Sequence, residues 1–198
     1  LYGFGNNQSL IGHHYPYSDG TGYAPKYQKQ QEYQWGMTLG GPIIKNKLFF
    51  FVNYENTNKT YPNLNGYRQS GSRVNPDEAD DVMQKIKDMA QRQGLSYDGT
   101  FANPDIYTKS NKFGAKIDWN INDFNKFSFR WSYVDAKQLN VVSSASSLND
   151  DHYYFPFTSK TNSFTAELQS RLSPVVSNEA RVSYVRVRDK RNVSSAFP

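Results

Sequence analysis

The sequence contains no cysteine, which excludes disulfide bonds and thiol chemistry. It has no apolar run approaching the roughly 18 residues that a membrane-spanning helix requires, so a transmembrane helix is excluded as well. Histidine is scarce, with 3 residues in all, and no nucleophile-elbow sequence is present. Because a serine nucleophile needs a convergent histidine and acid, we expect no enzymatic activity, and we expect no cofactor.

Aromatic residues are abundant in this chain, whereas aliphatic residues are few. Aromatic residues make up 16% of the chain, including 15 Tyr and 13 Phe, although hydrophobic residues reach only 37% and the mean hydropathy is −0.79. This combination is typical of a β protein with much of its surface in water. The chain opens on Leu1-Tyr2-Gly3 without an initiator methionine, so we expect it to be a segment of a longer protein.

The net charge is +5 and the pI is near 9.2, but most basic residues alternate with rings along the chain. We therefore expect no nucleic-acid partner. Basic residues cluster near the C-terminus, at Arg186, Arg188, Lys190 and Arg191. This cluster is either a solvated strand end, which we favour, or a phosphate-binding group.

Residues 31–55 are typical of a β-hairpin. The odd positions from Tyr33 to Leu39 are apolar and those between them are polar or small, which is the period of two of a strand. Gly40-Gly41-Pro42 is expected to break the regular pairing, because Pro donates no hydrogen bond and Gly has no side chain to pack. Lys45-Asn46-Lys47 then reverses the chain into a second arm over residues 48–54.

The same alternation predicts further strands. They cover residues 111–122, 126–135 and 164–172 and a final strand from Glu179, while residues 1–8 resemble the end of another strand. In the final strand the pattern slips, because Val185 and Val187 have the opposite parity from Tyr184. A β-bulge, which adds one residue to the strand, would return the apolar side chains to a single face of the sheet.

A short amphipathic helix is predicted within the connection over residues 56–108. Asn75 is a capping residue, Pro76 suits the first helical position, and acids follow at the positive end of the helix dipole. We interpret these acids as capping groups rather than calcium ligands, because their spacing is not that of a calcium loop. Gly94 is a natural terminator. The expected packing face is a thin apolar stripe of Val82, Ile86 and Met89.

The connections between the strands alternate between long and short. The short ones follow Ile44, Ile121 and Val176, while the long ones hold the helix, the histidines and clusters of tyrosine. An outer-membrane β-barrel has short turns at one end and longer loops at the other. We therefore predict an all-β chain, an antiparallel up-and-down transmembrane barrel segment of about seven strands.

The two faces of the predicted strands differ in chemistry. Charged side chains such as Lys112, Asp118 and Arg130 share one face and would cost several kcal/mol each in lipid, so that face should line the lumen. The ringed face then contacts lipid, and we expect its interfacial aromatics to be Tyr33, Trp35, Trp119, Trp131 and Tyr133. The alternative is a soluble β-rich binding domain whose core lies on the ringed face.

Residues 38–55, TLGGPIIKNKLFFFVNYE, closely resemble an early barrel hairpin of TonB-dependent outer-membrane receptors. The resemblance is to the Oar-like group, whose members usually carry a carboxypeptidase-regulatory-like domain. Residues 111–133, NKFGAKIDWNINDFNKFSFRWSY, are similar to the following hairpin in Bacteroidetes members of that group. The first motif is fairly specific, whereas the second is a general barrel pattern.

This resemblance implies a barrel of about 22 strands in the outer membrane of a Gram-negative bacterium. It also implies an N-terminal plug and energy supplied by the TonB complex, neither of which lies in this chain. Residues 1–198 would then be a partial barrel domain with a helix-containing loop insert at about residues 56–108. Phe49 and Phe51 occupy strand positions whose side chains should face the lumen, although that face is otherwise polar. We expect these two rings to face the plug.

Tyrosine rings in the long connections are the candidate ligand-binding residues, because they provide adaptable contact area at low entropic cost. The expected ligand is a peptide or glycan. His13-His14 and Asp150-Asp151-His152 lie on loops of the same side, but their spacing is not that of a metal site, and we expect no metal. An adhesin or export-associated barrel without energised import is the alternative function. The candidate ligand-binding residues are Tyr15, Tyr17, Tyr153, Tyr154 and Phe155.

Overall fold

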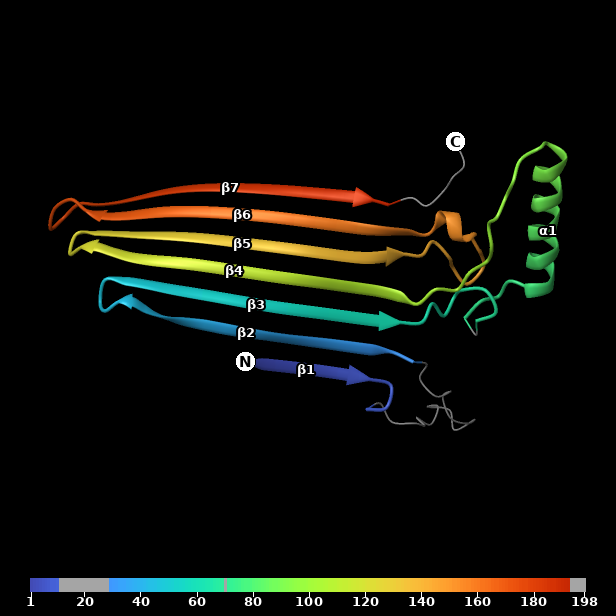
Figure 1. Ribbon diagram of the computed structural model, residues 1–198, viewed down its shortest axis with the longest axis horizontal. Coiled ribbons are helices and arrows are strands. Elements are labelled where there is room, and N and C mark those ends of the chain that lie inside the picture. Colours follow the sequence, from blue (N-terminus) through green and yellow to red (C-terminus); the bar gives the residue numbers. More distant parts are fainter. Residues whose placement is uncertain (11–28, 70, 193–198) are drawn as a thin grey trace.

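A computed structural model describes residues 1–10, 29–69 and 71–192, and it contains one seven-stranded antiparallel sheet (Figure 1). Each strand pairs with its neighbour in sequence, so the strand order in the sheet is the order in the chain. The strands are β1 (Tyr2–Asn7), β2 (Gln31–Ile44), β3 (Leu48–Tyr61), β4 (Ile106–Asn122), β5 (Asn125–Asn140), β6 (Phe155–Arg171) and β7 (Ser177–Arg191). The helix α1 (Pro76–Arg92) and a 3-10 turn η1 (Asp151–Tyr153) lie in the connections.

Tight turns join the strands at one end of the sheet and long connections join them at the other (Figure 1). Asn46 adopts a left-handed φ of 62° in the first tight turn, a conformation that Asn tolerates. In the second, Asn122 Oδ1 accepts hydrogen bonds from the backbone N–H groups of Phe124 and Asn125. The alternation predicted from the sequence is therefore confirmed, and the fold is an up-and-down sheet.

The strand register separates two faces of the sheet. One cross-strand row contains Phe50, Ile117, Phe129, Ala166 and Val182, and we call the face that carries it the aromatic face. The next row carries charged side chains and belongs to the opposite face, which we call the polar face. That second row is Asp118, Ser128, Glu167 and Arg181.

Neither face of the sheet is covered by a second layer among the described residues. The buried hydrophobic residues there are Ala79, Met83 and Tyr154, and all three lie in the connections rather than in the strands. Tyr184 and Val182 on β7, for example, are largely exposed. The described sheet therefore has no hydrophobic core of its own.

The strands are longer than the sequence pattern predicts. Pairing continues through Gly40 and Gly41, and the register shifts between Pro42 and Ile44. The predicted break in the regular pairing therefore occurs at the proline and not at the glycines. β3 extends to Tyr61 and β4 begins at Ile106, which reduces the loop insert to residues 62–105. Backbone hydrogen bonds make the ladder, and a polar stretch can pair as well as an apolar one.

The last strand contains no bulge. β7 pairs with β6 without a shift from Ser177 to Arg191, so the interpretation of the pattern slip as a β-bulge is wrong. Val185 and Val187 lie on the polar face, and Arg186 and Arg188 continue the aromatic face towards the long connections.

Helix α1 begins and ends as predicted, but it packs through a different face. Asn75 Oδ1 accepts a hydrogen bond from the N–H of Asp77 at 3.0 Å, and Gly94 has a φ of 74° just beyond the helix. The buried helical residues are Ala79 and Met83, whereas the expected packing stripe of Val82, Ile86 and Met89 is exposed. Within the described chain, α1 is too short and too polar to cross a membrane, as is every other helical segment.

Candidate functional site

Ring contacts cross the aromatic face from β2 to β7. Neighbouring rings have centroids 5.1 to 6.4 Å apart; Phe164, for example, lies 6.4 Å from both Trp131 and Tyr184. Tyr54 and Phe113, in the middle of the row, are direct cross-strand partners. We call this set the aromatic girdle, and its members are Trp35, Tyr54, Phe113, Trp131, Phe164 and Tyr184.

The polar tips of the girdle rings bond to residues on the side of the long connections. Tyr54 Oη donates to Asn111 Oδ1 at 2.7 Å, and Trp131 Nε1 donates to Asn162 Oδ1 at 3.4 Å. Both asparagines lie one step along the aromatic face beyond the girdle. Rings with an apolar body and a polar tip are enriched where a membrane meets water.

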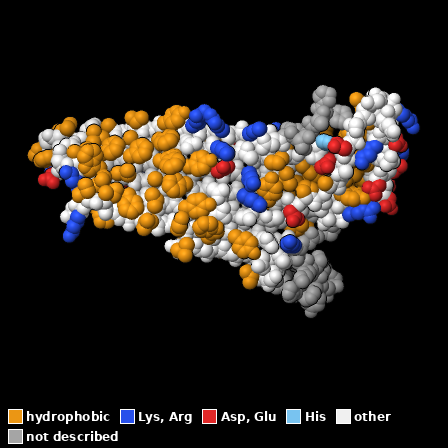
Figure 2. All heavy atoms as spheres, in the orientation of Figure 1, with side chains coloured by type: hydrophobic (Ala, Val, Ile, Leu, Met, Phe, Trp, Pro, Cys, Tyr) orange, Lys and Arg blue, Asp and Glu red, His pale blue; other side chains and the backbone are white. Residues whose placement is uncertain are grey.

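Between the girdle and the tight turns, the aromatic face is almost entirely apolar (Figure 2). Its side chains are solvent-accessible in the isolated chain, with Leu39 64% and Val182 73% exposed. A contiguous exposed apolar surface of this kind marks contact with a protein or a membrane.

The family comparison identifies that contact. Residues 1–67 and 56–197 match a family model described as an outer membrane beta barrel domain. The chain belongs to this family. Comparisons of the chain with curated proteins and with solved structures found no match. The barrel lies in the outer membrane of a Gram-negative bacterium, and the alternative of a soluble binding domain is set aside.

In the outer-membrane barrel, the aromatic face contacts lipid, because the charges of the polar face could not be buried in hydrocarbon. Trp35 and Trp131 lie in the girdle, and Tyr33 and Tyr133 lie one step beyond those two residues towards the long loops. Trp119 is at the opposite edge of the apolar band, beside the tight turn that follows β4. The structure thus places the predicted interfacial residues at the two edges of the apolar band.

The polar face, which faces the pore, carries matched charges. Glu55 accepts hydrogen bonds from Lys112 Nζ and from Tyr2 Oη, each at 2.6 Å. The Tyr2 ring crosses Gly36 to reach Glu55, and a Cβ at Gly36 would lie only 2.6 Å from the ring. The glycine therefore permits a contact that ties β1 to β3 and β4 across β2. Two further ion pairs on this face are Lys116 with Asp118 and Arg181 with Glu167.

Phe49 and Phe51 also lie on the polar face, as their parity predicts. Their direct cross-strand partners on β4 are Asp118 and Lys116, so both rings stand among charges. Phe51 is 44% exposed, and its direct partner on β2 is Gly40, where a Cβ would lie 3.1 Å from the Phe51 ring. No second layer of described residues covers these rings.

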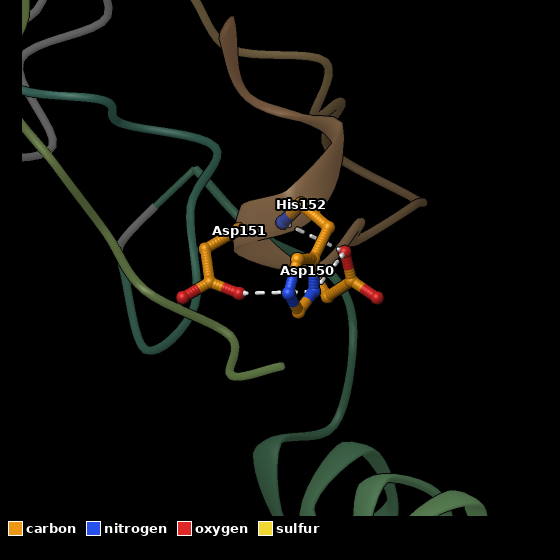
Figure 3. A group of neighbouring side chains, drawn as sticks. All are labelled: Asp150, Asp151 and His152. Atoms are coloured by element: carbon orange, nitrogen blue, oxygen red, sulfur yellow. Dashed lines mark hydrogen bonds and ion pairs between the residues drawn. The ribbon is translucent and has the colours of Figure 1, made fainter. Parts of the chain in front are cut away.

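At the end of the long loops, η1 gathers two carboxylates around a histidine (Figure 3). The ligand atoms of Asp150, Asp151 and His152 lie within 4.8 Å of one another, which is close enough for a shared cation. His152 Nδ1 is buried and lies 3.7 Å from Oδ1 of each aspartate, beyond hydrogen-bond distance. Both carboxylates, however, already accept hydrogen bonds from the protein.

Those hydrogen bonds connect the two long loops that the structure describes. Thr100 donates to Asp151 from its backbone N–H at 3.0 Å and from Oγ1 at 2.9 Å. Tyr97 Oη donates to Asp150, and His152 Nε2 lies 3.1 Å from a carboxylate oxygen of Asp98. Because Tyr97, Asp98 and Thr100 come from residues 62–105 and their partners from residues 141–154, we call this set the loop clamp. Both carboxylates thus serve as hydrogen-bond acceptors within the loop clamp.

The electrostatics of the loop clamp follow from its hydrogen bonds. Burial, with the nearby Asp150 carboxylate, raises the pKa of Tyr97 above its ordinary value. Burial also raises the pKa of Tyr154. Burial would also raise the pKa of Asp151. The hydrogen bonds from Thr100, with the nearby His152, lower it by more, so the pKa of Asp151 lies below its ordinary value. Asp151 is therefore stabilised as a carboxylate.

The candidate ligand-binding residues fall in different environments. Tyr153 is 62% exposed, whereas Tyr154 is buried, with its hydroxyl bonded to Asn149 O and Ser143 Oγ. Tyr154 is therefore part of the loop interior rather than of its surface. Phe155 begins β6 and lies beneath the Arg191 guanidinium, 5.3 Å from the ring centroid. The remaining candidates, Tyr15 and Tyr17, lie outside the described residues together with His13 and His14.

Sequence reasoning did not find the partners of the loop clamp. It singled out Asp150, Asp151 and His152, but not Tyr97, Asp98 or Thr100 about 50 residues earlier in the chain. These residues carry no motif, and their relation to η1 depends on how two long loops fold against each other. No local signal in the sequence could have revealed it.

Proposed function

We propose that this chain is part of a TonB-dependent outer-membrane transporter that binds a peptide or glycan at its extracellular loops and imports it through a plugged barrel. The observation that carries the proposal is the position of Phe49 and Phe51 on the pore face. A barrel filled only with water would gain nothing from exposed rings in its lumen. A plug domain would cover them and bury their apolar surface.

The loop end supports ligand capture. The loop clamp holds two long connections as one packed unit, which reduces the entropy that a ligand-binding surface would lose on binding. Tyr153, exposed on that unit, is the described candidate for first contact with the ligand. The proposed function includes no catalytic step.

Uptake by cells that express the full-length protein tests the proposed import. Fluorescent oligopeptides and oligosaccharides of graded size serve as probes, with and without a protonophore that removes the energy supply of TonB. We expect at least one probe to accumulate only when the protein is present and the membrane is energised. Accumulation that ignores the protonophore, or no accumulation of any probe, would contradict energised import.

Replacing both Phe49 and Phe51 with Ser tests the plug contact. The variant should loosen the plug in the full-length protein, which raises the hydrogen-exchange rate of plug amides while the barrel strands keep their protection. The matched control is Phe129→Ser with Phe50→Ser, which removes two rings from the opposite face of the same sheet. Unchanged plug protection in the Phe49/Phe51 variant would remove this argument for a plug.

The alternative is an adhesin, and the exposed apolar stripe of α1 favours it. Val82, Ile86 and Met89 face solvent on an extracellular loop, where they could contact a protein on another surface. Such a protein would bind the chain without energised uptake, so the protonophore experiment separates the two functions.

A further inference from the structure

Lys and Arg side chains recur at one place on the lipid side of the strands. On each of β4, β5, β6 and β7 a cation lies four residues beyond a ring of the aromatic face, towards the long loops. On β4 one more ring, Tyr107, lies past that cation, and Lys109 Nζ is 5.5 Å from its centroid. These pairs of ring and cation are Phe113 with Lys109, Tyr133 with Lys137, Phe164 with Lys160, and Tyr184 with Arg188. We call the four cations, with Arg186 and Lys190 beside them on β7, the outer cationic band.

The register places the cations of these four strands in neighbouring cross-strand rows of the aromatic face. Lys109 pairs directly with Lys137, Lys160 pairs with Arg188, and Lys190 follows Arg188 on the same face. Figure 2 shows Lys and Arg side chains gathered along the border of the apolar half of this face. At roughly 3.3 Å of rise per residue, four residues place each cation about 13 Å along a tilted strand from its ring. With the girdle at the edge of the hydrocarbon, that distance would place the cations at the level of the lipid headgroups.

Acidic partners of the outer cationic band are scarce among the described residues. Its one ion pair there is Lys160 with Asp135, at 3.3 Å. Lys109 and Lys137 are like charges in direct cross-strand register, an arrangement that destabilises a sheet unless an anion lies nearby. The polar face differs, because Lys59, Lys112, Lys116 and Arg181 each have an acidic partner within 3.5 Å.

We propose that the outer cationic band binds the phosphate groups of a phosphorylated lipid in the outer leaflet. Arg presents a planar fork of donors to phosphate, and Lys binds it as a point charge. The acyl chains of the same lipid would lie against the apolar band below the girdle, so a single molecule satisfies both surfaces. Phosphate binding by the basic cluster near the C-terminus was the interpretation that the sequence alone did not favour. The proposal adopts it for β7 and extends it to cations on three more strands.

A different explanation of surface cations is protection of an exposed sheet edge, for which Lys is often used. It could account for β7, which is at the edge of the described sheet. It does not account for Lys109, Lys137 and Lys160, because β4, β5 and β6 are paired on both sides. A lipid partner explains all four strands.

Lipid binding to the full-length protein, purified in detergent, tests the proposal. The probes are bis-phosphorylated lipid A, the same lipid after enzymatic removal of both phosphates, and inorganic phosphate. We expect wild type to bind the phosphorylated lipid at least tenfold more tightly than the dephosphorylated one. Equal affinity for the two lipids would overturn the proposal without any variant. Displacement of the lipid by millimolar inorganic phosphate would also overturn it, because the site would then be a free-anion site.

The test variant is Lys109→Gln with Lys137→Gln and Arg188→Gln, which removes three charges and keeps the Lys160–Asp135 pair. The matched control is Lys59→Gln with Lys116→Gln and Arg130→Gln, which removes three charges from the polar face. Heat-modifiable gel migration checks that both barrels fold. We expect the test variant to lose at least tenfold in affinity for the phosphorylated lipid and the control to retain it. Equal affinities of the two variants would overturn the proposal.

Discussion

At the scale of single residues, the loop clamp is held by hydrogen bonds to carboxylates rather than by apolar packing. Asp151 accepts two hydrogen bonds from Thr100, and its own N–H donates to Thr100 O at 2.9 Å. This exchange of three hydrogen bonds fixes one loop against the other. Because the pKa of Asp151 is lowered, the contact favours the ionised carboxylate over the protonated one.

The pH dependence of the loop clamp follows from that sign. A carboxyl group whose folded pKa is depressed stabilises the fold above its ordinary pKa of 3.8, and the contribution disappears as the pH falls through the folded value. Hydrogen exchange at Thr100 and Asp151, corrected for intrinsic rates, should show protection at pH 7 that Asp151→Asn lacks. As the pH falls through the folded pKa of Asp151, the two proteins should come to exchange alike. A difference that persists at low pH would show that the ionised carboxylate is not the cause.

At the scale of elements, the sequence predicted the strands, their alternation of faces and both ends of α1. These features depend on local chemistry, such as the capping Asn75 and the period of two in β4. The strand ends beyond the membrane were not predicted, because residues such as Asn58 and Lys109 pair through their backbones without an apolar pattern. The packed face of α1 was also missed, since it depends on which loop residues fold beneath the helix.

Helix α1 provides a test at this scale. Asn75→Ala removes the side-chain acceptor for the Asp77 N–H and should destabilise the helix by about 1 kcal/mol. Amide exchange across Pro76–Arg92 in the full-length protein should therefore accelerate about fivefold, which is that free energy expressed as a ratio. Gln91→Ala, an exposed change in the last turn, is the control and should leave exchange nearly unchanged. Equal exchange in both variants would show that the cap contributes little.

At the scale of the whole molecule, the described sheet separates two environments, lipid on its aromatic face and the barrel interior on its polar face. The aromatic face has no second layer and would be unstable in water, whereas lipid covers it without any further protein. The polar face carries ion pairs that need water or a plug beside them. The two faces and the girdle between loops and apolar band could be predicted from the sequence, because strand parity assigns each side chain to a face. The outer cationic band could not, because it depends on the cross-strand register.

A charge should destabilise the protein more on the aromatic face than on the polar face. Phe129→Arg puts a cation in the middle of the apolar band and should lower the free energy of unfolding by about 2 to 4 kcal/mol in lipid vesicles. Ser128→Arg puts the same charge on the polar face of the same strand and should cost much less. Denaturant unfolding of the refolded full-length protein measures both. Equal losses would mean that the two faces meet similar environments.

The most direct test of the account is the environment of single nitroxide labels, which is simplified because residues 1–198 contain no cysteine. Phe129→Cys and Ile117→Cys label the aromatic face, and Ser128→Cys and Thr165→Cys label the polar face. In bilayers, we predict that the first pair collides mainly with oxygen dissolved in lipid and the second mainly with a water-soluble nickel chelate. The reverse pattern, or aqueous accessibility at all four positions, would contradict the assignment of the aromatic face to lipid.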